Sequence, residues 1–102
     1  MTRIAAYVPD LMDRSKVAAA AKEAVFVRTP ADLAAAGADA DLVVVDLSRA
    51  GALDALSELS DVRTIGFGSH VDRDLLAAAT AAGCDEVLPR SKFFSTLHEL
   101  LA

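Results

Sequence analysis

Leu42-Val43-Val44-Val45-Asp46 is a run of four apolar residues that ends in a carboxylate. A continuous apolar run of this length, without alternating polar residues, is typical of a central parallel strand that helices cover on both faces. Open α/β sheets bind their ligands beside the carboxyl ends of the strands. Asp46 is therefore the first candidate for a functional residue.

Short strand-like and helix-like segments alternate on both sides of this run. Strands are expected over residues 4–8, 25–27, 42–46, 64–67 and 86–88, and helices over residues 12–21, 30–36, 50–59, 71–82 and 92–101. Such alternation favours a parallel sheet with right-handed crossovers. Pro89 ends the fifth strand, and proline is tolerated mainly in an edge strand. We therefore predict an α/β fold, a doubly wound (βα)5 five-stranded parallel sheet of order 2-1-3-4-5, which is the flavodoxin-like arrangement.

Length and hydropathy indicate a single small domain over residues 1–102. The chain is 54% hydrophobic, but no apolar stretch approaches the roughly 20 residues that span a bilayer. The start of the chain lacks the length of a secretory signal and leads directly into the first strand. We expect a cytoplasmic protein that makes no membrane contact and has no effector domain after Ala102.

Charge and cysteine content narrow the classes of partner. The net charge is −5, and the ten Lys and Arg residues are scattered along the sequence. Nucleic-acid binding needs a basic face, so nucleic acid is not expected as a partner. Cys84 is the only cysteine, so we expect a buried structural thiol and not a disulfide or a metal ligand.

Three parts of the sequence are similar to one known family. They are Asp10 after the first strand, the run that ends at Asp46, and Ala78-Ala79-Thr80-Ala81-Ala82-Gly83-Cys84-Asp85-Glu86-Val87-Leu88. In these parts the chain resembles the receiver domains of bacterial response regulators, and the resemblance covers essentially the whole chain. Receivers take part in two-component signalling by accepting a phosphoryl group from a histidine of a kinase. The resemblance places the phosphoacceptor at Asp46.

The resemblance also implies a divalent cation beside the acceptor. Receivers bind Mg²⁺ through an acidic pair after the first strand, the acceptor aspartate and a backbone carbonyl two residues beyond it. In this chain the ligands would be Asp10, Asp46 and the carbonyl of Ser48, while Pro9 stands where the second acid of the pair is expected. Because Mg²⁺ keeps several waters, weak binding is compatible with this reduced set. Asp13, one turn further on, is expected to be a solvated acid at the helix start.

Two further positions depart from the family pattern. The Ser or Thr that receivers place at the end of the fourth strand falls at Gly68, next to Ser69, and His70 follows in a loop expected to face the crevice. The lysine that neutralises phosphoryl charge falls at Arg90, whose planar guanidinium does not replace a point charge. The chain therefore looks like an atypical or pseudo-receiver.

The same residues have plainer interpretations. Asp46 can cap the loop that follows its strand, and Asp10 can cap the first helix. Gly66-Phe67-Gly68 lacks the third glycine of a dinucleotide-binding loop and follows the fourth strand instead of the first. Ser69, His70 and Asp46 have the side chains of a hydrolase triad, but no G-x-S-x-G turn surrounds the serine.

Two functions are compatible with these residues. The preferred one is a stand-alone pseudo-receiver with no enzymatic activity and no required cofactor, which binds another protein or a second copy of itself. Its partner face would include Phe93, Phe94 and Leu97 on the last helix, for which core packing is the alternative. The other function is a working response regulator that takes phosphoryl from a histidine kinase onto Asp46 with Mg²⁺.

Overall fold

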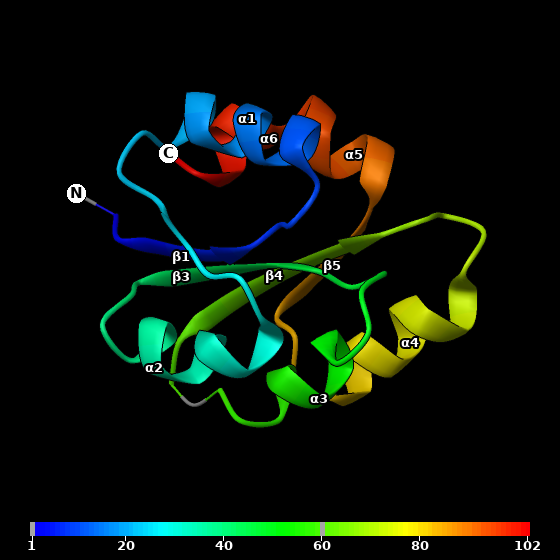
Figure 1. The fold of residues 1–102 in the computed structure, drawn as a ribbon. Coiled ribbons are helices and arrows are strands. Elements are labelled where there is room, and N and C mark those ends of the chain that lie inside the picture. The colour runs from blue at the N-terminus through cyan, green and yellow to red at the C-terminus, as the bar shows by residue number, and fades with distance from the viewer. Residues whose placement is uncertain (1, 60) are drawn as a thin grey trace.

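A five-stranded, all-parallel sheet forms the centre of the molecule, in a computed structural model that describes residues 2–59 and 61–102 (Figure 1). The strand order is β2-β1-β3-β4-β5, as predicted. The strands are β1 (Ile4–Tyr7), β2 (Val25–Phe26), β3 (Leu42–Asp46), β4 (Arg63–Gly68) and β5 (Glu86–Pro89). Each predicted strand is confirmed, and its ends differ from the prediction by at most one residue.

Helices cover both faces of this sheet. They are α1 (Leu11–Ala20), the 3₁₀ turn η1 (Pro30–Asp32), α2 (Leu33–Ala38), α3 (Ala52–Leu56), α4 (Arg73–Ala81), α5 (Arg90–Ser95) and α6 (Leu97–Leu100). Helices α1, α5 and α6 lie on one face, and α2, α3 and α4 lie on the other (Figure 1). Within the described residues, no helix combines the length and apolar character that crossing a bilayer requires.

The central strand β3 supplies both halves of the core. All five of its residues are buried, and their side chains point alternately to the two faces of the sheet. Leu42 and Val44 pack in the cluster under α1, α5 and α6, whereas Val43 and Val45 pack in the cluster under α2, α3 and α4. Because β3 packs against apolar side chains on both faces of the sheet, its sequence does not alternate between apolar and polar residues.

The last helix departs from the prediction of one helix over residues 92–101. The chain instead breaks at Thr96, where φ is −116° and ψ is 18°, and forms the two short helices α5 and α6. The hydroxyls of Ser95 and Thr96 both donate to the carbonyl oxygen of Lys92, at 3.0 and 2.8 Å. Hydrogen bonds of this kind compete with the regular helical pattern. The third helix is also shorter than predicted, and the second begins as a 3₁₀ turn.

Cys84 is buried two residues before β5, as the sequence predicts. Its thiol lies 3.2 Å from the carbonyl oxygen of Glu86 and 3.7 Å from that of Thr64. Burial raises the pKa of the Cys84 thiol to about 11. The residue is a packed structural thiol.

Leu47 attaches the segment after β3 to the sheet. Its backbone N–H donates to the carbonyl oxygen of Phe67 at 2.9 Å, and only 2% of the residue is exposed. A Cβ atom on Gly66 would lie 2.9 Å from both methyl carbons of Leu47. Position 66 therefore has to be glycine while Leu47 keeps this place.

Candidate functional site at the carboxyl edge of the sheet

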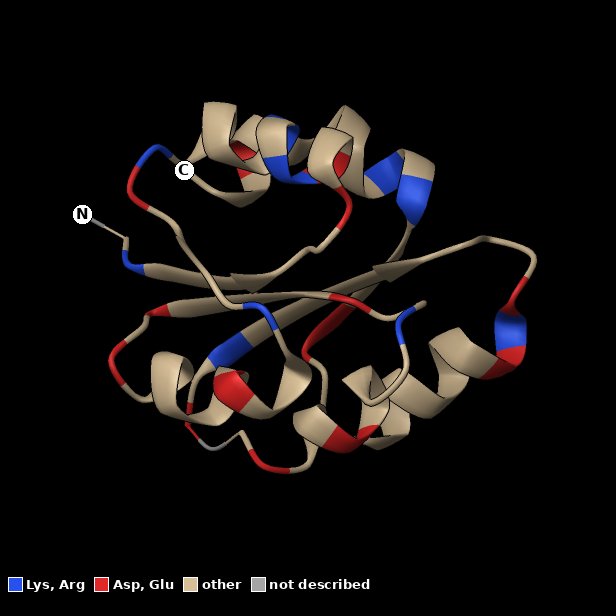
Figure 2. Ribbon diagram, in the orientation of Figure 1, with Lys and Arg blue, Asp and Glu red and all other residues tan. Residues whose placement is uncertain are grey.

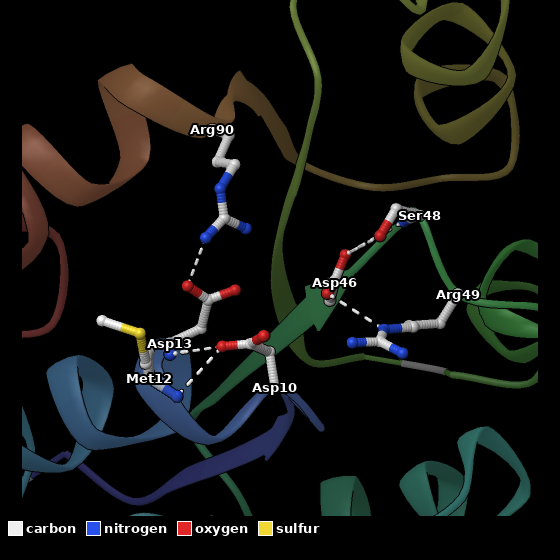
Figure 3. A network of polar contacts seen from close by, with 7 residues as sticks. All are labelled: Asp10, Met12, Asp13, Asp46, Ser48, Arg49 and Arg90. Atoms are coloured by element: carbon white, nitrogen blue, oxygen red, sulfur yellow. Dashed lines mark hydrogen bonds and ion pairs between the residues drawn. The ribbon is translucent and has the colours of Figure 1, made fainter.

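The parallel pairing of β1 with β3 brings Asp10 and Asp46 to the same edge of the sheet. Tyr7 lies opposite Val45 in this pairing, so Asp46 at the end of β3 lies near the loop that carries Asp10. Figure 3 shows both acids at this edge, together with Asp13, Arg49 and Arg90. This is the edge at which α/β sheets bind their ligands.

Asp46 is buried, and its neighbours in the following loop contact both of its carboxylate oxygens. Oδ1 accepts hydrogen bonds from the backbone N–H of Ser48 at 3.0 Å and from the Ser48 hydroxyl at 2.7 Å. Oδ2 lies 3.6 Å from Nε of Arg49. The Asp46 side chain is only 4% exposed, whereas that of Arg49 is 44% exposed. The carboxylate therefore caps its own loop, which is the plainer of the two roles that the sequence allows.

Asp10 caps helix α1, as the sequence allows. Its Oδ1 accepts hydrogen bonds from the backbone N–H groups of Met12 at 2.9 Å and Asp13 at 3.0 Å. These bonds, with that from Asp13 the larger contribution, lower the pKa of Asp10 below its ordinary value. Asp10 is therefore an exposed, ionised carboxylate with one oxygen engaged by the helix.

Asp13 is not the solvated acid that the sequence predicts, and that prediction is wrong. It is 2% exposed, and its Oδ1 accepts a hydrogen bond from the guanidinium of Arg90, which also forms an ion pair with it (Figure 3). Asp13 and Val17 are the two buried residues of α1. The acid lies one turn from Val17 on the stripe of the helix that faces the sheet, so the helix turns it inward.

Arg90 is held in place by Asp13 and by aromatic rings. The centre of its guanidinium lies 5.0 Å from the ring centroid of Phe94 and 5.9 Å from that of Phe67. The hydrogen bond to Asp13 raises the pKa of Arg90 further above its ordinary value. The cation that the resemblance assigns to the phosphoryl group is thus bonded to another acid.

The remaining predicted crevice residues do not add chemistry at Asp46. Gly68 ends β4 and has no side chain, and a Cβ there would lie 3.4 Å from methyl groups of Leu75 and Leu76. Ser69 and His70 are exposed. The Ser69 hydroxyl accepts a long hydrogen bond, 3.4 Å, from the backbone N–H of Val71. Among the hydrogen bonds of the described residues, none joins Ser69 to His70 or Asp46, as a triad would require.

The predicted partner-face residues divide between core and surface. Phe93 is fully buried and stacks on Phe67, with ring centroids 4.4 Å apart. Leu97 is also buried, with 6% exposure. Phe94 is half-buried and packs edge-on against Phe93. Core packing, the alternative that the sequence allows, therefore accounts for Phe93 and Leu97, and only Phe94 retains exposed area.

Sequence reasoning missed Arg49 and the pairing of Asp13 with Arg90. The signal for Arg49 is its position three residues after Asp46, within reach of a strand-ending carboxylate. The signal for Asp13 is its spacing of four from Val17, which places both on the buried stripe of one helix. Neither Arg49 nor Asp13 lies at a position of the family motif, so the resemblance assigns no role to them.

The acids at this edge do not form a ready metal site. No three His, Cys, Asp or Glu side chains cluster as metal ligands within residues 2–59 and 61–102. Oδ1 of Asp46 already accepts two hydrogen bonds, a guanidinium lies beside Oδ2, and Oδ1 of Asp10 caps α1. Every buried side-chain N or O atom that the structure describes has a hydrogen-bond partner. The donor set is therefore a poor fit to Mg²⁺, which needs several oxygens in near-octahedral geometry.

Comparison with solved structures identifies proteins with the same fold. A response regulator from Hahella chejuensis matches with a TM-score of 0.83 and 15% identity, over 99% of this chain and 92% of that chain. The Mn²⁺-bound form of response regulator Rcp1 matches at 0.79 and 15% identity, over 98% and 91%. The phosphorylated cyanobacterial phytochrome response regulator RcpA matches at 0.77 and 17% identity, over 98% and 88%. No family model and no curated protein matches the sequence. The chain has the fold of response regulator receiver domains, which confirms the fold that the resemblance implies.

Proposed function

We propose that this chain is a receiver-fold signalling module that binds a protein partner and does not use standard aspartyl phosphorylation. The observation that carries the proposal is that both carboxylate oxygens of Asp46 already contact residues of the following loop. Transfer of a phosphoryl group to an aspartate needs a free carboxylate oxygen and a divalent cation beside it. Here Ser48 occupies Oδ1 with two hydrogen bonds, and Arg49 lies beside Oδ2.

The contacts of Arg90 support the same conclusion. To stabilise a phosphoryl group on Asp46, its guanidinium would have to leave the buried carboxylate of Asp13. That acid would then be unpaired in a site that is 2% exposed, which is costly. The missing hydroxyl at Gly68 removes another contact to developing negative charge.

A working phosphoacceptor is the second candidate. Two observations favour it: Asp10 is an exposed and ionised acid at the same edge, and structural neighbours include a Mn²⁺-bound and a phosphorylated response regulator. In that function Asp46 would take phosphoryl from a histidine kinase with Mg²⁺ on Asp10 and the carbonyl of Ser48. The Arg49 side chain is 44% exposed, so its ion pair with Asp46 would be displaced most easily.

Treatment with beryllofluoride or a small phosphodonor plus Mg²⁺ tests the proposal. We expect no stoichiometric mass increase and no Mg²⁺-dependent amide shifts at Asp10 and Asp46. Arg49→Ala frees Oδ2 and should give a larger Mg²⁺ response at Asp46 than the wild type. Arg73→Ala, which removes an exposed arginine from α4, is the matched control and should leave the response unchanged.

One result would overturn the proposal: a stoichiometric adduct on the wild-type chain that Asp46→Asn abolishes. Asp46→Asn keeps the shape of the side chain, so a loss of adduct in that variant identifies the acceptor and not a folding defect. The chain would then be a working phosphoacceptor.

A further inference from the structure

The charges of the molecule are divided unequally between its two helical layers. Residues 11–27 and 90–102, which include α1, α5 and α6, contain five Lys or Arg and three Asp or Glu, a net charge of +2. Residues 28–89 contain four Arg and eleven Asp or Glu, a net charge of −7, but this segment includes β3, β4, β5 and the edge loops as well as the second layer. The helices of that layer, η1, α2, α3 and α4, contain one Arg and three Asp, a net charge of −2. Figure 2 shows acidic segments on the second layer, on the strands and in the loops at the sheet edges. The two helical layers therefore differ in the sign of their net charge, although the whole chain has a net charge of −5.

The α1 side presents cations in fixed positions. Arg14 lies over the ring of Phe26 at 4.8 Å, and Lys16 lies over the ring of Phe94 at 5.1 Å. Arg90 lies over the same Phe94 ring from α5. Cation–π contacts restrict these long side chains before any partner arrives, which lowers the entropy cost of binding. Arg90 is already paired with Asp13, so we call only Arg14 and Lys16 the basic surface.

The other layer contains a groove of matching character. It lies between η1 and α3, has a volume of about 270 Å³, and is lined by Pro30, Ala31 and Ala55 together with the acids Asp54 and Glu58. Neither acid takes part in an ion pair with another described residue. An apolar floor with two carboxylates suits the side chain of a lysine or arginine, whose stem is apolar and whose end is charged. We call this the acidic groove.

We propose that copies of this chain associate head to tail, with the basic surface of one copy against the acidic groove of the next. The proposal rests on the interaction-module function above and names the partner as a second copy. The two surfaces lie on opposite faces of the sheet, since α1 and α5 cover one face and α3 the other (Figure 1). A contact between different surfaces is heterologous, so each added copy leaves one basic surface and one acidic groove free.

Sedimentation velocity on the full chain, without phosphodonor, tests this contact. At an ionic strength of about 0.01 M, where the Debye length is about 30 Å, we expect species beyond the dimer to grow with protein concentration. At about 1 M salt, where the Debye length is about 3 Å, the protein should return to monomer. Both expectations follow from a contact made of exposed charges.

Two variants, Arg14→Glu/Lys16→Glu and Asp54→Lys/Glu58→Lys, each remove one of the two surfaces. The first changes the net charge from −5 to −9 and the second from −5 to −1, yet each variant alone should be monomeric. An equimolar mixture should form a 1:1 dimer and nothing larger, because one intact surface remains on each chain. Both chains are negative overall, so general attraction cannot produce this dimer. Lys22→Glu/Lys92→Glu also has a charge of −9 but keeps the basic surface, and should still associate.

Three results would overturn the head-to-tail contact: a wild-type monomer at millimolar concentration and low salt, a dimer that never grows further, or self-association of either surface variant. Melting curves of the variants confirm that each is folded before its mass is interpreted. None of these results bears on Asp46, so failure of this contact is distinguishable from failure of the proposed function.

Discussion

Two arginine–carboxylate pairs, one at each edge of the sheet, show how the surroundings of an acid decide what its partner does. At the carboxyl edge, Arg90 pairs with Asp13, whose side chain is 3% exposed. At the amino edge, Arg63 pairs with Glu86, whose side chain is 35% exposed. Both arginines are about half exposed. Water can replace Arg63 as a partner of Glu86, but it has little access to Asp13. The same chemical pair is therefore structural at one edge and dispensable at the other.

Arg90→Met should produce the largest effect. It leaves a buried carboxylate without its cation, and we expect the free energy of unfolding to fall by about 3 kcal/mol. Urea denaturation followed by circular dichroism measures this change. Adding Asp13→Asn should recover most of the loss, because no buried charge is then unpaired.

The matched control is Arg63→Met, which breaks the exposed pair and should cost at most about 0.5 kcal/mol. Equal losses for the two variants would contradict the comparison. A double variant no more stable than Arg90→Met alone would show that the loss comes from packing over Phe94 and not from the unpaired acid.

The thiol at the amino edge gives a second, smaller effect. Because the pKa of Cys84 is raised from 9.0 to about 11, the thiolate fraction near neutral pH is about 100-fold below that of an unshifted thiol. Alkylation by iodoacetamide, followed by mass spectrometry, should be slower in the folded chain than in urea by at least that factor. An equal rate in both states would show that the thiol is open to solvent.

The same shift makes stability depend on pH at the alkaline end. The unfolded chain loses the Cys84 proton near pH 9 while the folded chain keeps it to about pH 11, so stability falls as the pH rises through this window. The pKa of Arg90 is raised, so the pair at the carboxyl edge keeps its charge there. Cys84→Ala should reduce this alkaline loss, which melting curves measured across the window will show.

Asp85→Ala should produce a smaller effect than Arg90→Met. Its Oδ2 accepts a hydrogen bond from the backbone N–H of Thr64 at 2.8 Å, at the start of β4. Asp41 makes the same contact to the N–H of Arg3 at 2.9 Å. Loss of one such bond should cost about 1 kcal/mol, which is the usual net contribution of a single hydrogen bond to stability. Hydrogen exchange at Thr64 should accelerate, while exchange at Arg3 serves as the internal control.

The sheet could be predicted from the sequence because apolar strands and their order depend on local patterns. The run ending at Asp46 and the proline at the edge strand both act within a few residues. The capping role of Asp10 was predictable for the same reason. These features need no knowledge of what lies across the fold.

The site was predicted less well because its contacts join distant parts of the chain. Asp13 and Arg90 are 77 residues apart, and only the packing of α1 beside the start of α5 brings them together. The break at Thr96 depends on hydroxyl contacts that compete with a helical pattern that is otherwise regular. Arg49 was local but belonged to no motif, so its reach to Asp46 became evident only from the geometry.

The fit of Leu47 over Gly66 links the interior of the protein to the environment of Asp46. Leu47 is the residue between Asp46 and Ser48, and its methyl carbons occupy the space that a Cβ at position 66 would need. Leu47 is also bonded through its backbone N–H to Phe67 of β4, so the backbone that leads into Ser48 is attached to the sheet. A methyl group added at residue 66 would displace that leucine, so the packing of an apolar side chain and the loop beside Asp46 both depend on a glycine in the neighbouring strand.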